Sequence, residues 1–334
     1  MTLDALVYAS DESSRPDADD ADSLAAALAA TGTTWVRLNA PTAEEMNAVR
    51  AGTPIHPLSI EDVQNNVRPK VEEFGDHTFV LLKSVGLTRG ESTFEEELSE
   101  VPVGAFIGDD WLVTYCPEGE PDAVERAWRS AVDADGRLRS HGPDFAAYRV
   151  FDGLVDEYFG VVDGVEARIE RIEEEVIESP GRETLAEINS ARRELLRLRK
   201  VLWPARETVG TLARGDPDQI RQPTEKYFRD VYDHLVQLVD LVETYRDLAS
   251  GARDIYLNAL SVSTNEVMKR LTVVAVIFLP LSLVAGLFGM NFDSGASAWN
   301  MPELGWAYAY PATLLGMVGV AMVLVWHFRR EGWL

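Results

Sequence analysis

Two long, uncharged, apolar stretches near the end of the chain constrain its fold more than any other feature. No residue carries a charge from Leu271 to Phe292 or from Gly305 to Trp326. Each stretch suits a helix of about 20 residues, the length that crosses a bilayer core of roughly 30 Å. Because two such stretches follow each other, a membrane hairpin is favoured over the buried helices of a soluble protein. We therefore predict transmembrane helices over 271–291 and 305–328.

The charges that flank these spans predict their orientation. Lys269 and Arg270 precede the first span, and the basic tail 329–334 follows the second. The loop between the spans, 293–304, carries only the acids Asp293 and Glu303. Since short loops rich in Lys and Arg stay on the cytoplasmic side, we expect both termini in the cytoplasm and the loop outside the cell membrane. One hairpin cannot enclose a water-filled path, so a channel built from it must be an oligomer.

The chain before the spans reads as an α+β arrangement. Residues 1–30 hold seven acids and one base, which predicts an acidic, flexible N-terminus. Residues 31–142 combine β-like runs with helical stretches, and the turn Gly108-Asp109-Asp110 between two such runs predicts a hairpin in a cytoplasmic α/β domain.

The pattern then becomes helical. Residues 143–224 predict an antiparallel helical hairpin, broken by Ser179-Pro180-Gly181. Residues 225–292 contain no such break, so they predict one stalk helix of about 100 Å that continues into the first span.

Charge and residue types exclude several classes of function. The net charge of −24 argues against a nucleic-acid partner, which needs clustered Lys and Arg. The acidity fits a solvated acidic surface, carboxylates that bind cations, or both. The five histidines are scattered, Cys116 is the single cysteine, and the sequence has neither a P-loop nor an HExxH motif. We therefore expect that this protein is not an enzyme.

The first span ends in a short polar motif, Gly289-Met290-Asn291. Gly and Asn are common where a helix ends, so Asn291 fits a helix cap. A polar side chain at the outer end of an apolar span, just before an acidic loop, fits a contact with a passing ion equally well.

This motif, between two C-terminal spans, resembles the signature of the CorA family of magnesium transporters. Other segments agree with the resemblance, which extends over about residues 50–334. They are 264–269 before the first span, 301–304 in the loop, 227–234 on the stalk, and 56–62 and 68–72 in the α/β domain.

The resemblance implies a funnel-shaped homopentamer that carries hydrated Mg2+, and also Co2+ and Ni2+, into the cell along the membrane potential. Gly289, Met290 and Asn291 would form the selectivity filter, and Asp293 and Glu303 would attract cations to the mouth. The first span would line the pore, with its apolar part as a gate. The residues implied for this pore wall are Asn265, Met268, Leu271, Ala275, Leu279, Ser282 and Gly286.

The resemblance also implies that cytoplasmic Mg2+ binds between subunits through carboxylates and holds the pore closed. It favours Asp254 as a sensor, with Asp230 as a second candidate. The position aligned with the partner carboxylate is Thr88, which is not an acid, and Glu91 is the nearest acid that could replace it. This departure from the family pattern leaves the sensor pair open.

Two other functions remain to be weighed. A zinc transporter of the same superfamily would be expected to place His or Cys on the pore face, which has neither. A membrane-anchored Mg2+ sensor without transport would not need polar residues such as Asn265 and Asn291 at both ends of the first span.

Overall fold

The computed structural model describes residues 3–9, 12–16, 18, 20–89, 96–133, 135–178, 180–293, 295, 297 and 299–333. The chain divides into two compact units, Met1–Asp254 and Ile255–Leu334. The helix α8 (Gln222–Phe288) contributes to both units.

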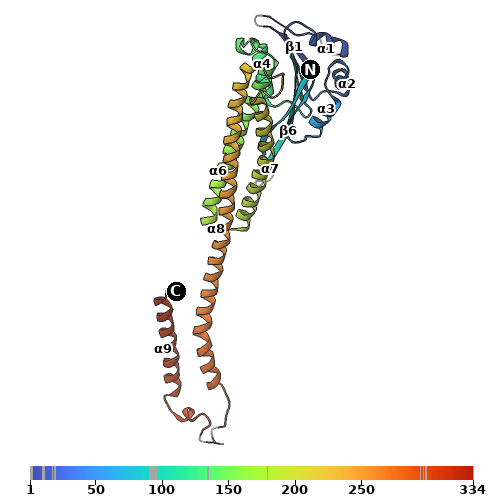
Figure 1. Cartoon of the computed structure of the whole chain (residues 1–334). Coiled ribbons are helices and arrows are strands. Elements are labelled where there is room, and N and C mark those ends of the chain that lie inside the picture. The colour runs from blue at the N-terminus through green and yellow to red at the C-terminus, as the bar shows by residue number, and fades with distance from the viewer. Residues whose placement is uncertain are drawn as a thin grey trace. The chain divides into compact units, whose positions relative to one another are not determined.

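The first unit is built on a seven-stranded sheet (Figure 1). Its strands are β1 (Leu3–Tyr8), β2 (Ser13–Ser14), β3 (Thr33–Asn39), β4 (Lys70–Phe74), β5 (His77–Arg89), β6 (Glu96–Ile107) and β7 (Trp111–Cys116). They lie in the order β2-β1-β3-β7-β6-β5-β4. Only the β3–β7 pair is parallel among these strands. The hairpin predicted around Gly108 joins β6 to β7, where the Gly108 N–H donates to the Trp111 carbonyl at 2.8 Å.

The start of the chain belongs to this sheet, so the prediction of a flexible segment over 1–30 was wrong. Strand β1 pairs with β3, and its Asp4 carboxylate lies 2.7 Å from the guanidinium of Arg37. Leu6 and Tyr8 are buried because both faces of the sheet are covered there. The Ala-rich stretch that follows forms α1 (Ala21–Leu28), whose first turn is capped by Asp20 and Ser23.

Helices cover both faces of the sheet (Figure 1). On one face, α1, α2 (Ala43–Gly52) and α3 (Pro57–Gln64) pack their apolar side chains, Leu24, Val49 and Ile60 among them, into one core with the strands. On the other face lie α4 (Asp122–Val132) and the start of α6 (Pro143–Glu178), with the short α5 (Gly136–Arg139) between them in sequence. There Trp128 packs edge-on against Trp35, and the Tyr158 hydroxyl donates to the Lys83 carbonyl.

The helices α6, α7 (Arg182–Ala213) and the first part of α8 run side by side (Figure 1). Helices α6 and α7 lie within the range predicted for the helical hairpin, 143–224, and α8 begins three residues before its predicted start. Buried residues recur on α8 at alternating intervals of three and four, which places them on one face against the other helices. They are Phe228, Val231, Leu235, Leu238, Val242, Tyr245, Ala249 and Ala252.

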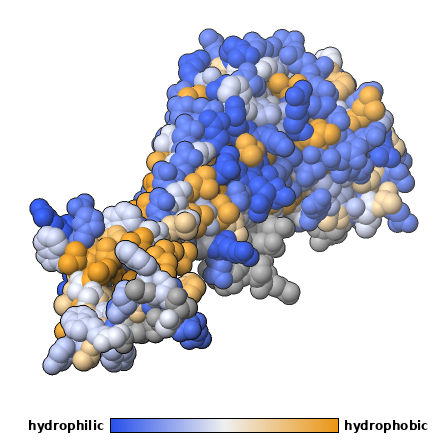
Figure 2. Space-filling view, turned by 90° about the horizontal axis from the view of Figure 1, so that it is seen from below, coloured by the Kyte–Doolittle hydropathy of each residue, from blue (hydrophilic) through white to orange (hydrophobic). Residues whose placement is uncertain are grey.

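The second unit contains the end of α8, a 3-10 turn (Pro302–Gly305) and α9 (Ala309–Arg330). Both helices contain windows long and apolar enough to cross a membrane, with mean hydropathies of 2.6 and 1.8, and almost nothing in these windows is buried. Figure 2 shows hydrophobic side chains gathered over this unit. The second helix begins four residues after its predicted start, because Pro302 initiates the separate 3-10 turn.

Candidate functional site

The apolar part of α8 has two distinct faces. On one face Val273 is buried, and the residues at helical spacing after it are half-buried, namely Ile277, Pro280, Leu281 and Val284. At 3.6 residues per turn, the predicted pore-lining residues lie on the opposite face. All seven are exposed in the single chain, and Leu279 is 71 % exposed. This face is therefore free to meet water or other copies of the chain.

The helix α8 ends in the predicted filter motif. The Gly289 N–H donates to the Ala285 carbonyl at 2.9 Å, and the Met290 N–H donates to the Leu287 carbonyl at 3.2 Å. The last carbonyl groups of a helix lack a following turn whose N–H groups could donate hydrogen bonds to them. These carbonyls, together with the negative end of the helix dipole, favour a cation at this position.

Asn291 is not a left-handed cap of α8. Its φ is not positive, so it does not adopt the left-handed conformation of a capping residue. Its side chain is exposed and has no hydrogen-bond partner among the residues that the structure describes. The amide is therefore available to a ligand or to a neighbouring chain.

The two acids of the loop differ in their surroundings. Asp293 is exposed, and its Oδ1 accepts a hydrogen bond from the Gly295 N–H at 2.8 Å. Its carbonyl accepts from the Asn300 side chain at 2.7 Å, so Asp293 also helps to fold the loop. Glu303 is half-buried within the 3-10 turn.

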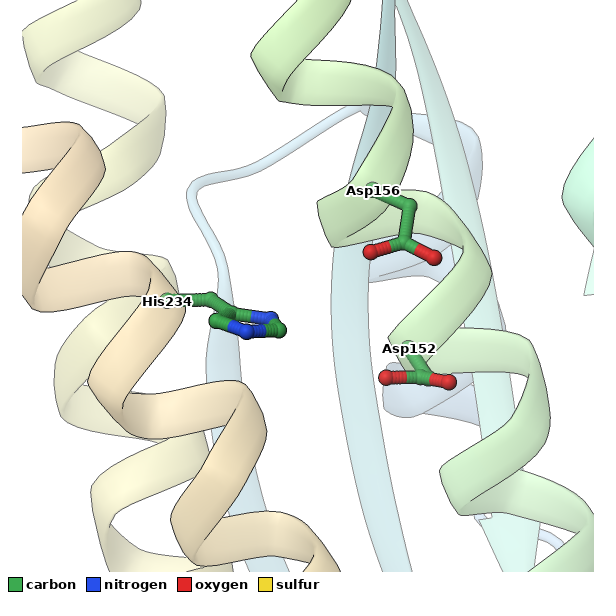
Figure 3. Close-up of side chains that lie close together, drawn as sticks. All are labelled: Asp152, Asp156 and His234. Atoms are coloured by element: carbon green, nitrogen blue, oxygen red, sulfur yellow. The ribbon is translucent and has the colours of Figure 1, made fainter.

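A second group of potential metal ligands lies in the first unit (Figure 3). Asp152 and Asp156 lie one turn apart on α6, and His234 projects toward them from α8. One ligand atom from each of these three residues lies within 4.8 Å of the others. We call these three residues the α6–α8 cluster.

The electrostatics of the α6–α8 cluster favour a cation. Burial, followed by the charge of Asp156, raises the pKa of the Asp152 carboxyl, although the Tyr148 hydroxyl donates to it at 3.2 Å. The Nδ1 atom of His234 is buried and has no hydrogen-bond partner in the described part of the chain. Asp230 lies one turn before His234, and its charge contributes to raising the pKa of Tyr148 to about 12, an effect that burial and Asp152 dominate.

These residues fit a divalent ion. Two carboxylates would offset its charge, and the unpaired Nδ1 could supply a neutral nitrogen ligand. Oxygen ligands suit Mg2+, whereas the imidazole is better suited to Co2+, Ni2+ or Zn2+.

Comparison with known proteins relates this arrangement to one family. Residues 30–330 match the model of the "CorA-like Mg2+ transporter protein" family. The chain belongs to the CorA-like Mg2+ transporter family. A relative from Thermotoga maritima, the "Cobalt/magnesium transport protein CorA", is 40 % identical over 84 % of this chain and 77 % of its own length.

More distant CorA proteins agree. The "Magnesium transport protein CorA" of Haemophilus influenzae is 26 % identical over 90 % of this chain and 92 % of its own. The complete structure of the CorA magnesium transporter from Methanocaldococcus jannaschii matches with a TM-score of 0.80 at 21 % identity, over 100 % of this chain and 99 % of that one. The predicted fold class is thereby confirmed: an N-terminal α/β domain, a long helix and two apolar C-terminal helices of the CorA-like kind.

The structure separates the sensor candidates that the resemblance to CorA suggested. Asp230 lies on α8 within one turn of the α6–α8 cluster. Asp254 is exposed and follows His234 by 20 residues on the same helix, about 30 Å at 1.5 Å per residue. Glu91 lies outside the described residues, as does any side-chain contact of Thr88.

The sequence analysis did not identify the three residues of the α6–α8 cluster as metal ligands. The spacing of four between Asp152 and Asp156 was a usable signal, because it places both carboxylates on one face of a helix. His234 stood within the stalk segment 227–234. What the sequence lacked was the register that brings this turn of α8 opposite Asp152.

Proposed function

We propose that this chain assembles as a homopentamer in the cell membrane and forms a channel for the influx of hydrated Mg2+, with Co2+ and Ni2+ as further substrates. Family membership supports the transport of divalent cations, and the relatives reported above are named for cobalt and magnesium. The observation that carries the proposal is the exposed face of α8, which the exposed side chain of Asn291 follows three residues after the helix ends. In this proposal both termini lie in the cytoplasm.

The proposed filter acts through hydrogen bonds to the water shell of the ion. Mg2+ gives up its water reluctantly, so uncharged oxygen atoms suit a hydrated ion better than a ring of carboxylates would. Five Asn291 side chains and the Gly289 carbonyls could accept hydrogen bonds from these waters and release them again. Asp293 and Glu303 would raise the local cation concentration at the mouth. The membrane potential would contribute about 4.6 kcal/mol per 100 mV for a divalent ion.

The pore wall would be mostly apolar. Asn265 gives it a polar residue near the cytoplasmic end and Ser282 a hydroxyl near the middle. Between them, Leu271, Ala275 and Leu279 offer no hydrogen bond to a hydrated ion. A narrow apolar pore loses its water easily, which makes this stretch suitable as a gate.

We propose further that cytoplasmic cations control the channel by binding at the α6–α8 cluster together with Asp230. When bound, a divalent cation would supply positive charge between carboxylates that otherwise repel one another. Asp152 and Asp156 would bind it through oxygen and His234 through Nδ1. A carboxylate from a neighbouring subunit would complete such a site, and Asp254 remains a candidate for a separate one lower on the stalk.

Two alternatives remain as outcomes of experiment. A zinc carrier is disfavoured because none of the seven proposed pore-lining residues is His or Cys. A sensor without transport is disfavoured because the exposed polar side chain of Asn291 lies at the end of the span farthest in sequence from the cytoplasmic unit, where a sensor would not need one.

The test is cation influx into liposomes that contain the purified protein. An entrapped Mg2+-sensitive dye would report influx under an imposed potential, for wild type, Asn291→Ala and a matched variant far from the filter in sequence, Asn47→Ala, whose side chain is exposed on α2. We expect wild type and Asn47→Ala to conduct, and Asn291→Ala to lose most of the influx while remaining oligomeric.

Each other result has a definite meaning. Equal influx in wild type and Asn291→Ala would show that the protein is a channel but that Asn291 is not part of its filter. No wild-type influx of Mg2+ or Co2+, even into vesicles free of internal divalent cations, would contradict the proposal and favour the sensor. Influx of Zn2+ alone would favour the zinc carrier.

A further inference from the structure

The bases of the second unit gather at one end. Residues 255–334 contain four, Lys269 and Arg270 on α8 and Arg329 and Arg330 at the end of α9. All four are exposed. Two acids, Glu266 and Glu331, accompany them, so this end is positive in a chain whose net charge is −24. Such a concentration of positive charge implies an anionic partner at this place.

The last turn of α9 is folded to hold this group together. Gly332 adopts a φ of 70°, which glycine tolerates without strain. The turn is closed by hydrogen bonds from the Trp333 N–H to the Phe328 carbonyl (2.9 Å) and from the Gly332 N–H to the Arg329 carbonyl (3.3 Å). The chain thereby turns back, and the Trp333 ring stacks on the Phe328 ring with centroids 5.7 Å apart. This is the Schellman pattern of helix termination, with its accompanying apolar contact.

One cation of each helix lies beside an aromatic ring, and the folded-back tail supplies the ring that Lys269 approaches. The Lys269 ammonium lies 5.8 Å from the centroid of the Trp333 ring, so this contact links α8 to the end of the chain. The Arg330 guanidinium lies 5.7 Å from the centroid of the Trp326 ring. Lys269 and Arg330 have no ion-pair partner among the described residues, whereas Arg270 lies 3.9 Å from Glu266.

We propose that Lys269 and Arg330 each bind the phosphate group of an anionic phospholipid at the cytoplasmic membrane surface, with Trp333 beside the first base and Trp326 beside the second at the headgroup level. A phosphate ester offers oxygen atoms that accept charge-assisted hydrogen bonds from an ammonium or a guanidinium. The lipid is preferred to a soluble phosphate because the aromatic rings belong to the interfacial region and the helices beyond them are apolar and exposed. A zwitterionic headgroup should bind these bases more weakly, because its own ammonium group offsets the negative charge of its phosphate.

The proposal can be tested by native mass spectrometry of the full-length protein in detergent. The protein would be incubated with equal amounts of phosphatidylglycerol and phosphatidylcholine that carry identical acyl chains. A base near an anionic surface contributes about fivefold in affinity. We therefore expect the ratio of bound phosphatidylglycerol to phosphatidylcholine to fall by about tenfold or more in the double variant Lys269→Gln/Arg330→Gln.

A matched control removes the same charge elsewhere. The double variant Arg126→Gln/Arg129→Gln neutralises two exposed bases of α4 and should leave the ratio unchanged. Glu331→Gln removes a local acid and should raise the ratio. The mass of the intact assembly, read in the same spectra, verifies that each variant is folded.

Two results would overturn the inference. One is an unchanged lipid ratio in Lys269→Gln/Arg330→Gln while its assembly remains intact. The other is displacement of bound phosphatidylglycerol by millimolar glycerol 3-phosphate, which would identify the group as a site for a soluble phosphate.

Discussion

The guanidinium of Arg168 on α6 and the carboxylate of Glu194 on α7 form a buried ion pair. The Arg168 Nη1 atom lies 2.8 Å from one carboxylate oxygen and 2.9 Å from the other, and the Ser190 hydroxyl lies 3.3 Å from the first. Both side chains are more than nine-tenths buried. The pair joins two neighbouring helices, so it restricts the register between them.

Removing one partner of this pair should be costly. Glu194→Ala would leave a buried guanidinium without its counter-ion, which typically costs about 3–5 kcal/mol. We expect a clearly lower midpoint of thermal unfolding for the detergent-purified protein, measured by circular dichroism. The double replacement Arg168→Met/Glu194→Leu should recover much of the loss, because it buries no charge. A larger loss in the double variant than in Glu194→Ala would contradict this explanation.

Asp152→Asn should stabilise the protein when divalent cations are absent. The pKa of the Asp152 carboxyl is raised in the folded state by burial and by Asp156, so the folded state binds this proton more tightly than the unfolded chain does. The stability associated with the group is present at low pH and is lost as pH rises through the folded pKa. At neutral pH in chelator, an uncharged amide avoids this loss, and the midpoint of thermal unfolding should rise by a few degrees. A lower midpoint would mean that the Asp152 charge is well compensated.

The same variant should respond differently to added cations. Wild type is expected to gain thermal stability on addition of Mg2+ or Co2+, since a ligand that binds only the folded state stabilises it. Asp152→Asn should lose most of this gain, whereas Asp254→Asn should retain the part that arises at the α6–α8 cluster. Equal losses in both variants would show that the two positions contribute to one site.

His234→Ala should distinguish between ions. Imidazole nitrogen is a good ligand for Co2+ and Ni2+ and a poor one for Mg2+. We therefore expect His234→Ala to raise the dissociation constant for Co2+ by about tenfold or more and to change the dissociation constant for Mg2+ much less. Calorimetric titration of the purified protein with each ion would measure this. An equal effect on both ions would exclude His234 as a direct ligand.

Leu279→Ser should impair closure of the proposed gate. Leu279 lies on the exposed face of α8, and a hydroxyl there would help to keep water in a narrow pore. Liposome influx measured with millimolar Mg2+ inside should rise several-fold over wild type. Ile277→Ser places the same hydroxyl on the half-buried face and should leave the closed channel tight. A similar leak in both variants would indicate that the added hydroxyl acts by destabilising α8 rather than by wetting the pore.

Much of the fold could be predicted from local pattern. Two β-like runs, 103–107 and 111–115, on either side of a Gly-Asp-Asp turn led to the β6–β7 hairpin, and the Ser-Pro-Gly break separated α6 from α7. The N-terminal strand was missed because the acids surrounding residues 3–8 outweighed a short run of apolar residues. Its stability comes from pairing with β3 and from the Asp4–Arg37 contact, neither of which a local pattern contains.

The candidate site was predictable only where it is continuous in sequence. The motif from Gly289 to Asn291 and the proposed pore face of α8 were identified from the resemblance to the CorA family, whose motif is continuous in sequence. The α6–α8 cluster joins residues about 80 positions apart, and its ligands meet only because α6 and α8 pack in one register. Aromatic contacts such as Tyr148 with Phe228, at 6.0 Å between centroids, help to set that register. Spacing along the sequence does not reveal such contacts.

The parallel pairing of β3 with β7 has a consequence for synthesis of the chain. The Trp35 indole of β3 donates to the Thr114 hydroxyl of β7, 79 residues later. Until β7 has left the ribosome, β3 can pair only with β1, and its other edge stays open to unintended partners. Non-local pairing of this kind folds slowly and exposes apolar surface meanwhile. Production of this protein should therefore depend on chaperones that bind nascent chains well before either membrane span is made.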